Sequence, residues 1–268
     1  MNKLSRIILF LILAISFVPL VRAKDLTLTI VYDNNTYNEE LETRWGFSCL
    51  VEGLPKTILF DVGGEGDILL NNMEKLGIDP KAIDIIVLSH IHYDHIGGLS
   101  TFLKENPEAC VYLPGSFPES IKDIVRKVDA ELVEVHNPIR VCKNAYSTGE
   151  LGAFIKEQSL IIKTDKGLVI ITGCAHPGIV NVIKKAKGML GKEVYPKGVY
   201  LVLGGFHLCW MNTWQVRGII NGVKREKVEK VAPSHCSGDL ARELFKKAYG
   251  DDFILSGAGK KIRVKDAF

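Results

Sequence analysis

The 268-residue sequence has six cysteines but no C-x-x-C pair. It also lacks low-complexity segments, repeat arrays and any linker that would separate independent domains. An even cysteine count allows disulfides, but a chain of this length with 47% hydrophobic residues can bury a core without such staples. These absences favour one large domain, or two fused halves, over residues 24–268.

The first 23 residues contain no acidic residue. A basic start, "MNKLSR", precedes the apolar run "IILFLILAISFVPLV", and small residues lead to Ala23. This order is typical of a signal peptide, and the run is short for a membrane span, so we expect cleavage after Ala23 and export to the periplasm or medium. Loss of Lys3, Arg6 and Arg22 would take the formal charge from +3 to about zero. A near-neutral mature protein argues against a nucleic-acid partner, and cleavage would leave no membrane segment.

One short stretch, "SHIHYDHIGG" over residues 89–98, holds three of the seven histidines. His90, His92, Asp94 and His95 have the spacing H-x-H-x-D-H directly after an apolar run at residues 83–88, which predicts a buried strand. Imidazole and carboxylate ligands together suit zinc, iron or manganese. Because these ligands exceed what one ion usually takes from one turn, we expect two neighbouring divalent ions, with zinc favoured.

The rest of the chain alternates apolar strand patterns with amphipathic helix patterns, the latter predicted to end at glycines such as Gly77. Strands up to residue 173 form a first half with helices between them, and the remainder repeats the style. We therefore predict an α/β fold of the αββα sandwich type. The predicted strands cover 26–33, 46–52, 56–61, 83–88, 109–114, 131–136, a hairpin over 158–173, 198–205, 228–235 and part of 253–264; the predicted helices cover 68–76, 119–128, 179–187, 213–226 and 238–250, with another from Leu99.

Several other predicted strands also end in polar residues able to bind metal. These residues are Asp61, Cys174, His176, His207 and His235. Ligand sites in open α/β sheets lie at the carboxyl ends of strands. We therefore expect these residues to meet the His90 turn on one face of the sandwich.

These motifs resemble the metallo-β-lactamase superfamily over nearly all of residues 24–268. "LFDVGG", "VLSHIHYDHIGGL" and the later histidines occur in that family's order. The wording "GFSCLVE", "STGEL", "EQSLII", "TGCAHPGIVN", "GGFHL" and "PSHCSG" is similar to a narrower branch. That branch is labelled 7,8-dihydropterin-6-yl-methyl-4-(β-D-ribofuranosyl)aminobenzene-5′-phosphate synthase-like.

The resemblance implies a role for each matching residue. His90 and His92 would bind a first ion, and Asp94, His95 and His235 a second. Asp61 would orient the histidine turn without binding metal itself.

Two departures from the family pattern leave ligands open. The family has a histidine near "STGEL", where this chain has Glu150, while His136 falls too far upstream. Cys174 takes the place of the usual bridging aspartate, so we expect His176 to complete the first site and Cys174 to be either a thiolate ligand or a small buried neighbour.

Structural roles are considered for four further residues. His207 is a metal ligand, a substrate contact or a hydrogen-bonded core histidine. Cys236, next to His235 on a predicted strand, is expected to point the other way and pack in the interior. Cys49 and Cys110 are expected to be small core residues.

The expected activity follows from the ions. A bound divalent ion generates hydroxide near neutral pH, which attacks a carbonyl or phosphorus, and Asp94 would both bind metal and orient the attacking group. The leading hypothesis is an exported hydrolase of a small ester, lactone or phosphoester.

The alternatives are a pterin-forming transfer that displaces diphosphate, an iron-based redox protein on the same ligands, and a metal-holding module without turnover. Export argues against the transfer, because pterin synthesis uses cytoplasmic substrates. The glycines of "FDVGGEGD" lack the Lys-Ser/Thr of a phosphate-binding loop and do not support a nucleotide site.

Overall fold

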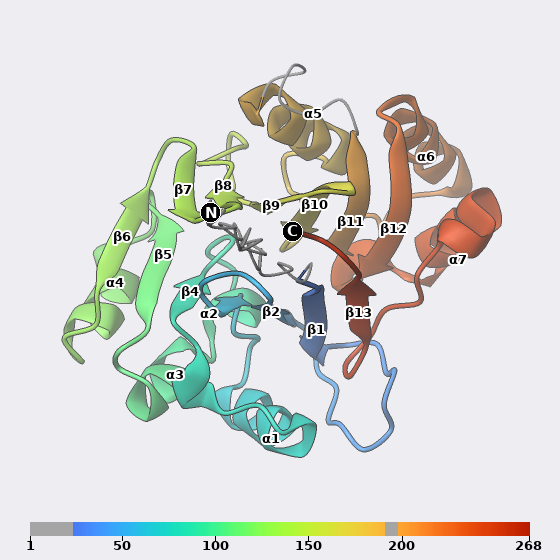
Figure 1. Cartoon of the computed structure of the whole chain (residues 1–268). Helices are drawn as coiled ribbons and strands as arrows, with labels where there is room; N and C mark the ends of the chain where they lie inside the picture. The colour runs from blue at the N-terminus through green and yellow to red at the C-terminus, as the bar shows by residue number, and fades with distance from the viewer. Residues whose placement is uncertain (1–23, 191–197) are drawn as a thin grey trace, which may run out of the picture.

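A computed structural model describes residues 24–190 and 198–268, which form two β-sheets packed face to face (Figure 1). The first sheet has the order β13 (Lys261–Val264), β1 (Leu26–Asp33), β2 (Phe47–Glu52), β3 (Ile58–Phe60), β4 (Ile85–Val87), β5 (Cys110–Pro114) and β6 (Leu132–Val135). The second has the order β12 (Val228–Ser234), β11 (Val199–Gly205), β10 (Gly167–Thr172), β9 (Leu160–Thr164), β8 (Ala145–Ser147) and β7 (Ile139–Cys142).

Apolar side chains from both sheets meet in the space between them. Leu28 and Ile30 of β1 lie in one buried cluster with Val169 and Ile171 of β10 and Leu203 of β11. The two-residue alternation of strand side chains sends every second residue into this layer. Each fully buried aliphatic side chain contributes about 1.5–3 kcal/mol relative to exposure, so this layer holds the two sheets together.

Helices cover both outer faces of the sandwich, as Figure 1 shows. The helices α1 (Gly66–Leu76), α3 (Leu99–Glu105) and α4 (Glu119–Arg126) pack on the first sheet. The helices α5 (Ile179–Leu190), α6 (Thr213–Arg225) and α7 (Asp239–Tyr249) pack on the second. A one-turn helix, α2 (Tyr93–Ile96), and 3₁₀ turns at Pro80–Ala82, His235–Ser237 and Gly250–Asp252 complete the described helical segments. The predicted αββα sandwich is confirmed.

Most element predictions agree with the structure. β1 has the predicted bounds, and α1 ends at Gly77, which adopts a left-handed conformation with φ of 69° as a C-terminal glycine does. The division into halves was wrong, however. The hairpin β9–β10 belongs to the second sheet, and β13 returns to the first.

The short strands β7 and β8 were not predicted. They have four and three residues, and the segment carries Arg140, Lys143 and Asn144, so no apolar periodicity marks it. Within the predicted strand region at 253–264, only Lys261–Val264 is a strand. Such short strands, at or next to a sheet edge, are stabilised by pairing with neighbours rather than by their own composition.

The predicted signal peptide, residues 1–23, lies outside the described residues. Within the described ranges, no helix has the length and apolar character needed to cross a membrane.

The topology gathers the ends of distant strands. β3 pairs with β4 in parallel, and β11 pairs in parallel with both β10 and β12. Parallel neighbours end at the same edge of a sheet. The segments after β3, β4, β10, β11 and β12 therefore meet at one end of the sandwich, as expected from the sequence.

Candidate metal centre

The histidine turn begins where β4 ends. His90 is fully buried, His92 precedes the one-turn helix α2, and Asp94 and His95 lie on that helix. The sequence predicted a plain turn here. A single helical turn instead places the side chains of Asp94 and His95 beside each other, with His95 Nε2 3.5 Å from Asp94 Oδ2.

The Asp61 side chain holds this turn in place through three contacts. Its Oδ1 accepts the backbone N–H of Ser89 at 2.6 Å, and its Oδ2 lies 2.7 Å from both the Ser89 hydroxyl and His95 Nδ1. Asp61 is itself fully buried and adopts a left-handed φ of 57°. The carboxylate thus orients the ring of His95 so that Nε2 faces the other candidate ligands, in keeping with the orienting role that the family resemblance implied.

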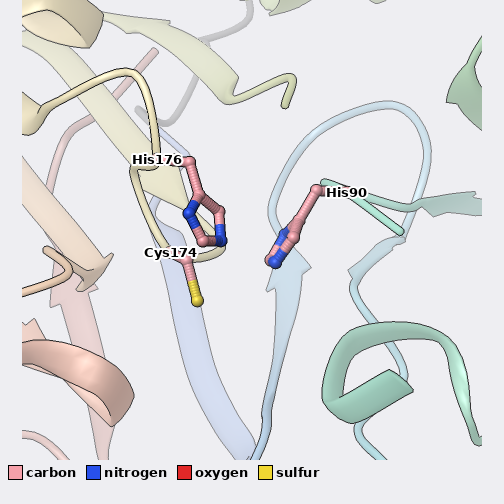
Figure 2. Close-up of side chains that lie close together, drawn as sticks. All are labelled: His90, Cys174 and His176. Carbon is pink, nitrogen blue, oxygen red and sulfur yellow. The ribbon is translucent and has the colours of Figure 1, made fainter. Parts of the chain in front are cut away.

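One ligand group is formed by His90, Cys174 and His176, whose donor atoms lie within 4.8 Å of one another. Figure 2 shows His90 facing the other two side chains, which come from the loop after β10. His92 adjoins this group, since its Nδ1 lies 3.1 Å from His90 Nε2 and 3.2 Å from His176 Nε2.

A second ligand group is formed by His95, Cys174 and His235. Asp94 adjoins it, with Oδ2 3.1 Å from His235 Nε2. The other ring nitrogen of His235 lies 2.8 Å from Asn34 Oδ1, which fixes the ring orientation. Cys174 Sγ lies 3.3 Å from His95 Nε2, so the sulfur stands between the two groups.

The two groups differ in charge state before any ion binds. Burial, together with the neighbouring imidazoles, lowers the pKa of His176 to about 4 and that of His90 well below its usual range. Burial opposes protonation of His95 too, but the Asp61 and Asp94 carboxylates raise its pKa to about 9. Burial would raise the pKa of Asp94, yet the His235 and His95 contacts hold it at about 2.

The residues present fit divalent ions. Two neutral imidazole nitrogens, of His90 and His176, approach the same His92 nitrogen, which has one lone pair or one hydrogen and cannot satisfy both contacts. Nδ1 of His207 is buried without a hydrogen-bond partner, and Nε2 of His235 is buried with the Asp94 carboxylate 3.1 Å away. Unsatisfied buried nitrogens are costly, and a cation beside the nitrogens of His90, His92 and His176 and beside Nε2 of His235 would remove that cost.

Glu157 is a functional residue that the sequence reasoning missed. Its carboxylate is buried and accepts the backbone N–H groups of Cys174, Ala175 and His176 at 3.0, 2.8 and 2.8 Å. Burial raises its pKa to about 7. The residue belongs to the "EQSLII" motif quoted for the resemblance, but nothing in that motif shows that it holds the metal-binding loop.

Glu150 and His136, the two residues considered in place of the family's missing histidine, contact each other instead of the metal ligands. Glu150 accepts the backbone N–H of Ser116 at 2.7 Å, and its other oxygen is 3.5 Å from His136 Nδ1. Neither Glu150 nor His136 belongs to a ligand group among the described residues. Glu150 therefore braces a loop instead of entering the cluster.

Cys236 is buried as predicted, but the strand geometry behind that prediction was wrong. The prediction rested on strand alternation, but β12 ends at Ser234, and residues 235–237 form a 3₁₀ turn. On that turn Cys236 forms a third ligand group with Cys174 and His207. Cys49 is a core residue as predicted, whereas Cys110 is only partly buried.

Exposed aromatic side chains lie near the ligands. The ring of Trp45 is 4.8 Å from that of His235, and Tyr93, 70% exposed, stands between His92 and Asp94 in sequence. Phe154 is fully exposed and lines a pocket of about 540 Å³ together with His176. These rings offer flat apolar surface beside the metal ligands.

Comparison with known proteins agrees with this geometry. The family model described as the metallo-beta-lactamase superfamily matches residues 46–185. The 7,8-dihydropterin-6-methyl-4-(beta-D-ribofuranosyl)-aminobenzene-5′-phosphate synthase of Methanocaldococcus jannaschii is 31% identical, over 88% of this chain and 95% of its own.

Solved structures show the same fold. Tm1679, described as a metal-dependent hydrolase of the beta-lactamase superfamily, is 27% identical with a TM-score of 0.73, over 90% of this chain and 99% of its own. YhfI from Bacillus subtilis, a metallo-beta-lactamase fold protein, is 12% identical with a TM-score of 0.66, over 88% of this chain and 99% of its own.

Proposed function

The chain belongs to the metallo-β-lactamase superfamily, and on this basis we propose that it is a metal-dependent hydrolase of a small ester, lactone or phosphoester. One observation carries the proposal. Ligands from both sheets converge in two adjoining groups, with Asp94 beside His95 and His235. The hydrolase description of Tm1679, over nearly the whole chain, supports it.

Each ligand has a defined task in this proposal. His90, His92 and His176 would hold one divalent ion, and Asp94, His95 and His235 a second, with zinc as the proposed metal and iron or manganese as alternatives. Bound there, such ions polarise the substrate and lower the pKa of water. Asp94 keeps its carboxylate ionised, so it can accept a hydrogen bond from the attacking water and orient it.

The surroundings favour a small molecule with a flat ring. Phe154 and Ile155 line the pocket that reaches His176, and Trp45 lies against His235. Exposed rings at a metal site are suited to stacking with planar apolar groups. A nucleic-acid substrate is not proposed, because the predicted mature chain has almost no net charge.

The second candidate is a pterin-forming transfer. The observation favouring it is the 31% identity to the Methanocaldococcus jannaschii synthase over 95% of that protein. The same Asp94 and histidine ligands would then assist departure of diphosphate, and an acceptor would replace water. The proposed signal peptide at residues 1–23, with export to the periplasm or medium, weighs against this candidate because its substrates are cytoplasmic.

Substrate panels separate the two candidates. The purified protein, loaded with zinc, is assayed on chromogenic esters, lactones and phosphodiesters, and separately for diphosphate release from an activated methyl-pterin. A hydrolase turns over at least one of the first group without an acceptor. Diphosphate release that requires the ribofuranosylaminobenzene phosphate acceptor would instead establish the transfer and overturn the hydrolase proposal.

A further inference from the structure

The second sheet ends in a cluster of soft ligands. The segments after β10, β11 and β12 carry Cys174, His207 and Cys236, and the three donor atoms lie within 4.8 Å of one another. Both cysteines are buried, with 4% and 2% of their surface exposed. All three residues come from the second sheet, whereas the other two ligand groups also include first-sheet histidines.

The backbone is shaped to bring the two sulfur-bearing loops together. Gly205, at the end of β11, lies between them. A Cβ at this position would stand 2.4 Å from Gly173 O, 2.7 Å from Cys236 Sγ and 3.2 Å from Cys174 Cα. No side chain fits there, so glycine permits an approach that any other residue would prevent.

One polar atom of this group has no hydrogen-bond partner among the described residues. Nδ1 of His207 is buried without a hydrogen-bond partner, and His207 adopts a left-handed φ of 55°. Cys236 Sγ donates a long hydrogen bond, 3.7 Å to Cys174 O. A strained, half-buried imidazole with an unpartnered Nδ1 beside two thiols has an energetic reason to bind a cation.

We propose that Cys174, His207 and Cys236 form a thiolate-rich metal site, distinct from the histidine–carboxylate centre but joined to it through Cys174. Two sulfurs and one imidazole nitrogen favour zinc or another thiolate-preferring ion, such as Cd²⁺ or Cu⁺. On binding a divalent ion, the two thiols each release a proton to solvent and two metal–sulfur bonds form, without any change of oxidation state.

The sharing of Cys174 has a consequence for both sites. Its sulfur belongs to all three ligand groups among the described residues, and a thiolate sulfur can bridge two ions but not three. Filling the thiolate-rich site therefore leaves Cys174 at most one bond to the histidine–carboxylate centre. An ion bound at the thiolate-rich site therefore limits the number of bonds that Cys174 can form in the histidine–carboxylate centre.

Spectroscopy of the reduced full-length protein with Co²⁺ tests the proposal. Thiolate-to-metal absorption reports the number of bound sulfurs, and metal content is measured in parallel. The parent is expected to show two thiolates, and Cys236→Ser about half of that absorption with one ion fewer. The matched control Cys209→Ser removes a nearby thiol that is outside the group and should change neither.

A second variant separates this site from the proposed function. His92→Ala removes a histidine beside the first ligand group and should abolish hydrolysis while leaving the two-thiolate absorption intact. Absorption and metal content that are unchanged in Cys236→Ser would overturn the proposal, whatever the activity.

If Cys236→Ser fails to fold, the parent protein can be tested by cysteine alkylation with and without bound metal. Bound Cd²⁺ should slow alkylation of Cys174 and Cys236 by at least about tenfold, with Cys209 as the internal reference. Equal alkylation with and without the ion would overturn the proposal. So would a Cys174–Cys236 disulfide that persists under reductant, because the sulfurs would then be unavailable.

Discussion

The two walls of the metal centre are built in different ways. The wall from the first sheet takes His90, His92, Asp94 and His95 from six consecutive residues after one strand. The wall from the second sheet takes its ligands from the ends of three parallel strands. The first wall is a local sequence motif, whereas the second exists only once the sheet has formed.

The anchors of the two walls differ as well. Asp61 contacts the first wall through a side-chain hydroxyl, an imidazole and one backbone N–H, so it orients individual ligands. Glu157 contacts three consecutive backbone N–H groups, so it positions the Cys174–His176 loop as a unit. Breaking one anchor should therefore affect one ligand ring, and breaking the other a whole segment.

The largest effect is expected from Asp94→Ala, which breaks the first wall at its reactive residue. The variant loses a ligand beside His235 and the acceptor that orients the attacking water. We expect hydrolysis to fall on the order of a thousand-fold or more. Asp94 lies on the one-turn helix and is partly exposed, so the melting temperature of the metal-free protein should change little. Rates and thermal melts of both proteins provide the check, and a fully active variant would exclude a hydrolytic centre here.

Glu157→Gln should have the next largest effect, on the second wall. A glutamine has only one acceptor oxygen and places an amide donor against a backbone N–H of the loop. We expect affinity at the His90–Cys174–His176 group to fall about 10- to 100-fold. Competition with a chelator measures this affinity. Glu150→Gln makes the same exchange at a carboxylate outside the cluster, and an equal loss in both variants would show that Glu157 has no special role.

Metal binding should release a different number of protons at each ligand group. The metal affinities of the two groups should therefore differ in pH dependence, by about tenfold per pH unit for one proton. His95, with a pKa of about 9, must lose a proton before it binds, so affinity at its group should rise with pH up to about 9. His176, with a pKa of about 4, is already neutral, so its ring should add no proton release above about pH 5. Calorimetry in buffers of different ionisation enthalpy counts the protons.

A Cys174→Ser background removes the thiol proton common to both groups. Asp61→Asn in that background should lower the pKa of His95 and reduce the proton release. Identical pH dependence at the two groups would contradict the assigned charge states.

The smallest effect is expected from His136→Ala. The ring of this histidine is largely exposed and pairs only loosely with Glu150, 3.5 Å away. An exposed pair of this kind contributes about 0–1 kcal/mol, so activity and metal content should be unchanged. A loss of bound metal in this variant would return His136 to the ligand set.

The first wall could be predicted from the sequence because its information is local. The buried run before His90 and the spacing of the four ligands stand within one segment of chain. The convergence of His176 and His235 on it was also expected, because parallel strands share their carboxyl edge. The αββα layers followed from the alternation of strand and helix patterns.

The remaining features depend on three-dimensional contacts that no local pattern encodes. Glu157 lies before β9 and reaches the loop after β10 only through the hairpin. Cys236 was misplaced because the chain leaves strand geometry at His235, whose φ of 44° no propensity predicts. The predicted assignment of strands to the two halves was also wrong, because β13 pairs with β1 and these strands come from opposite ends of the described chain.

That last pairing has a consequence for how the molecule is made. β1 exposes one edge until residues 261–264 have left the ribosome, because β13 is its partner on that side. An open strand edge with an apolar inner face is a template for association between nascent chains. The histidine turn is synthesised early, but the sheet that supports it is completed by the final strand. The first sheet is therefore closed on the β1 side only after every proposed metal ligand has been synthesised.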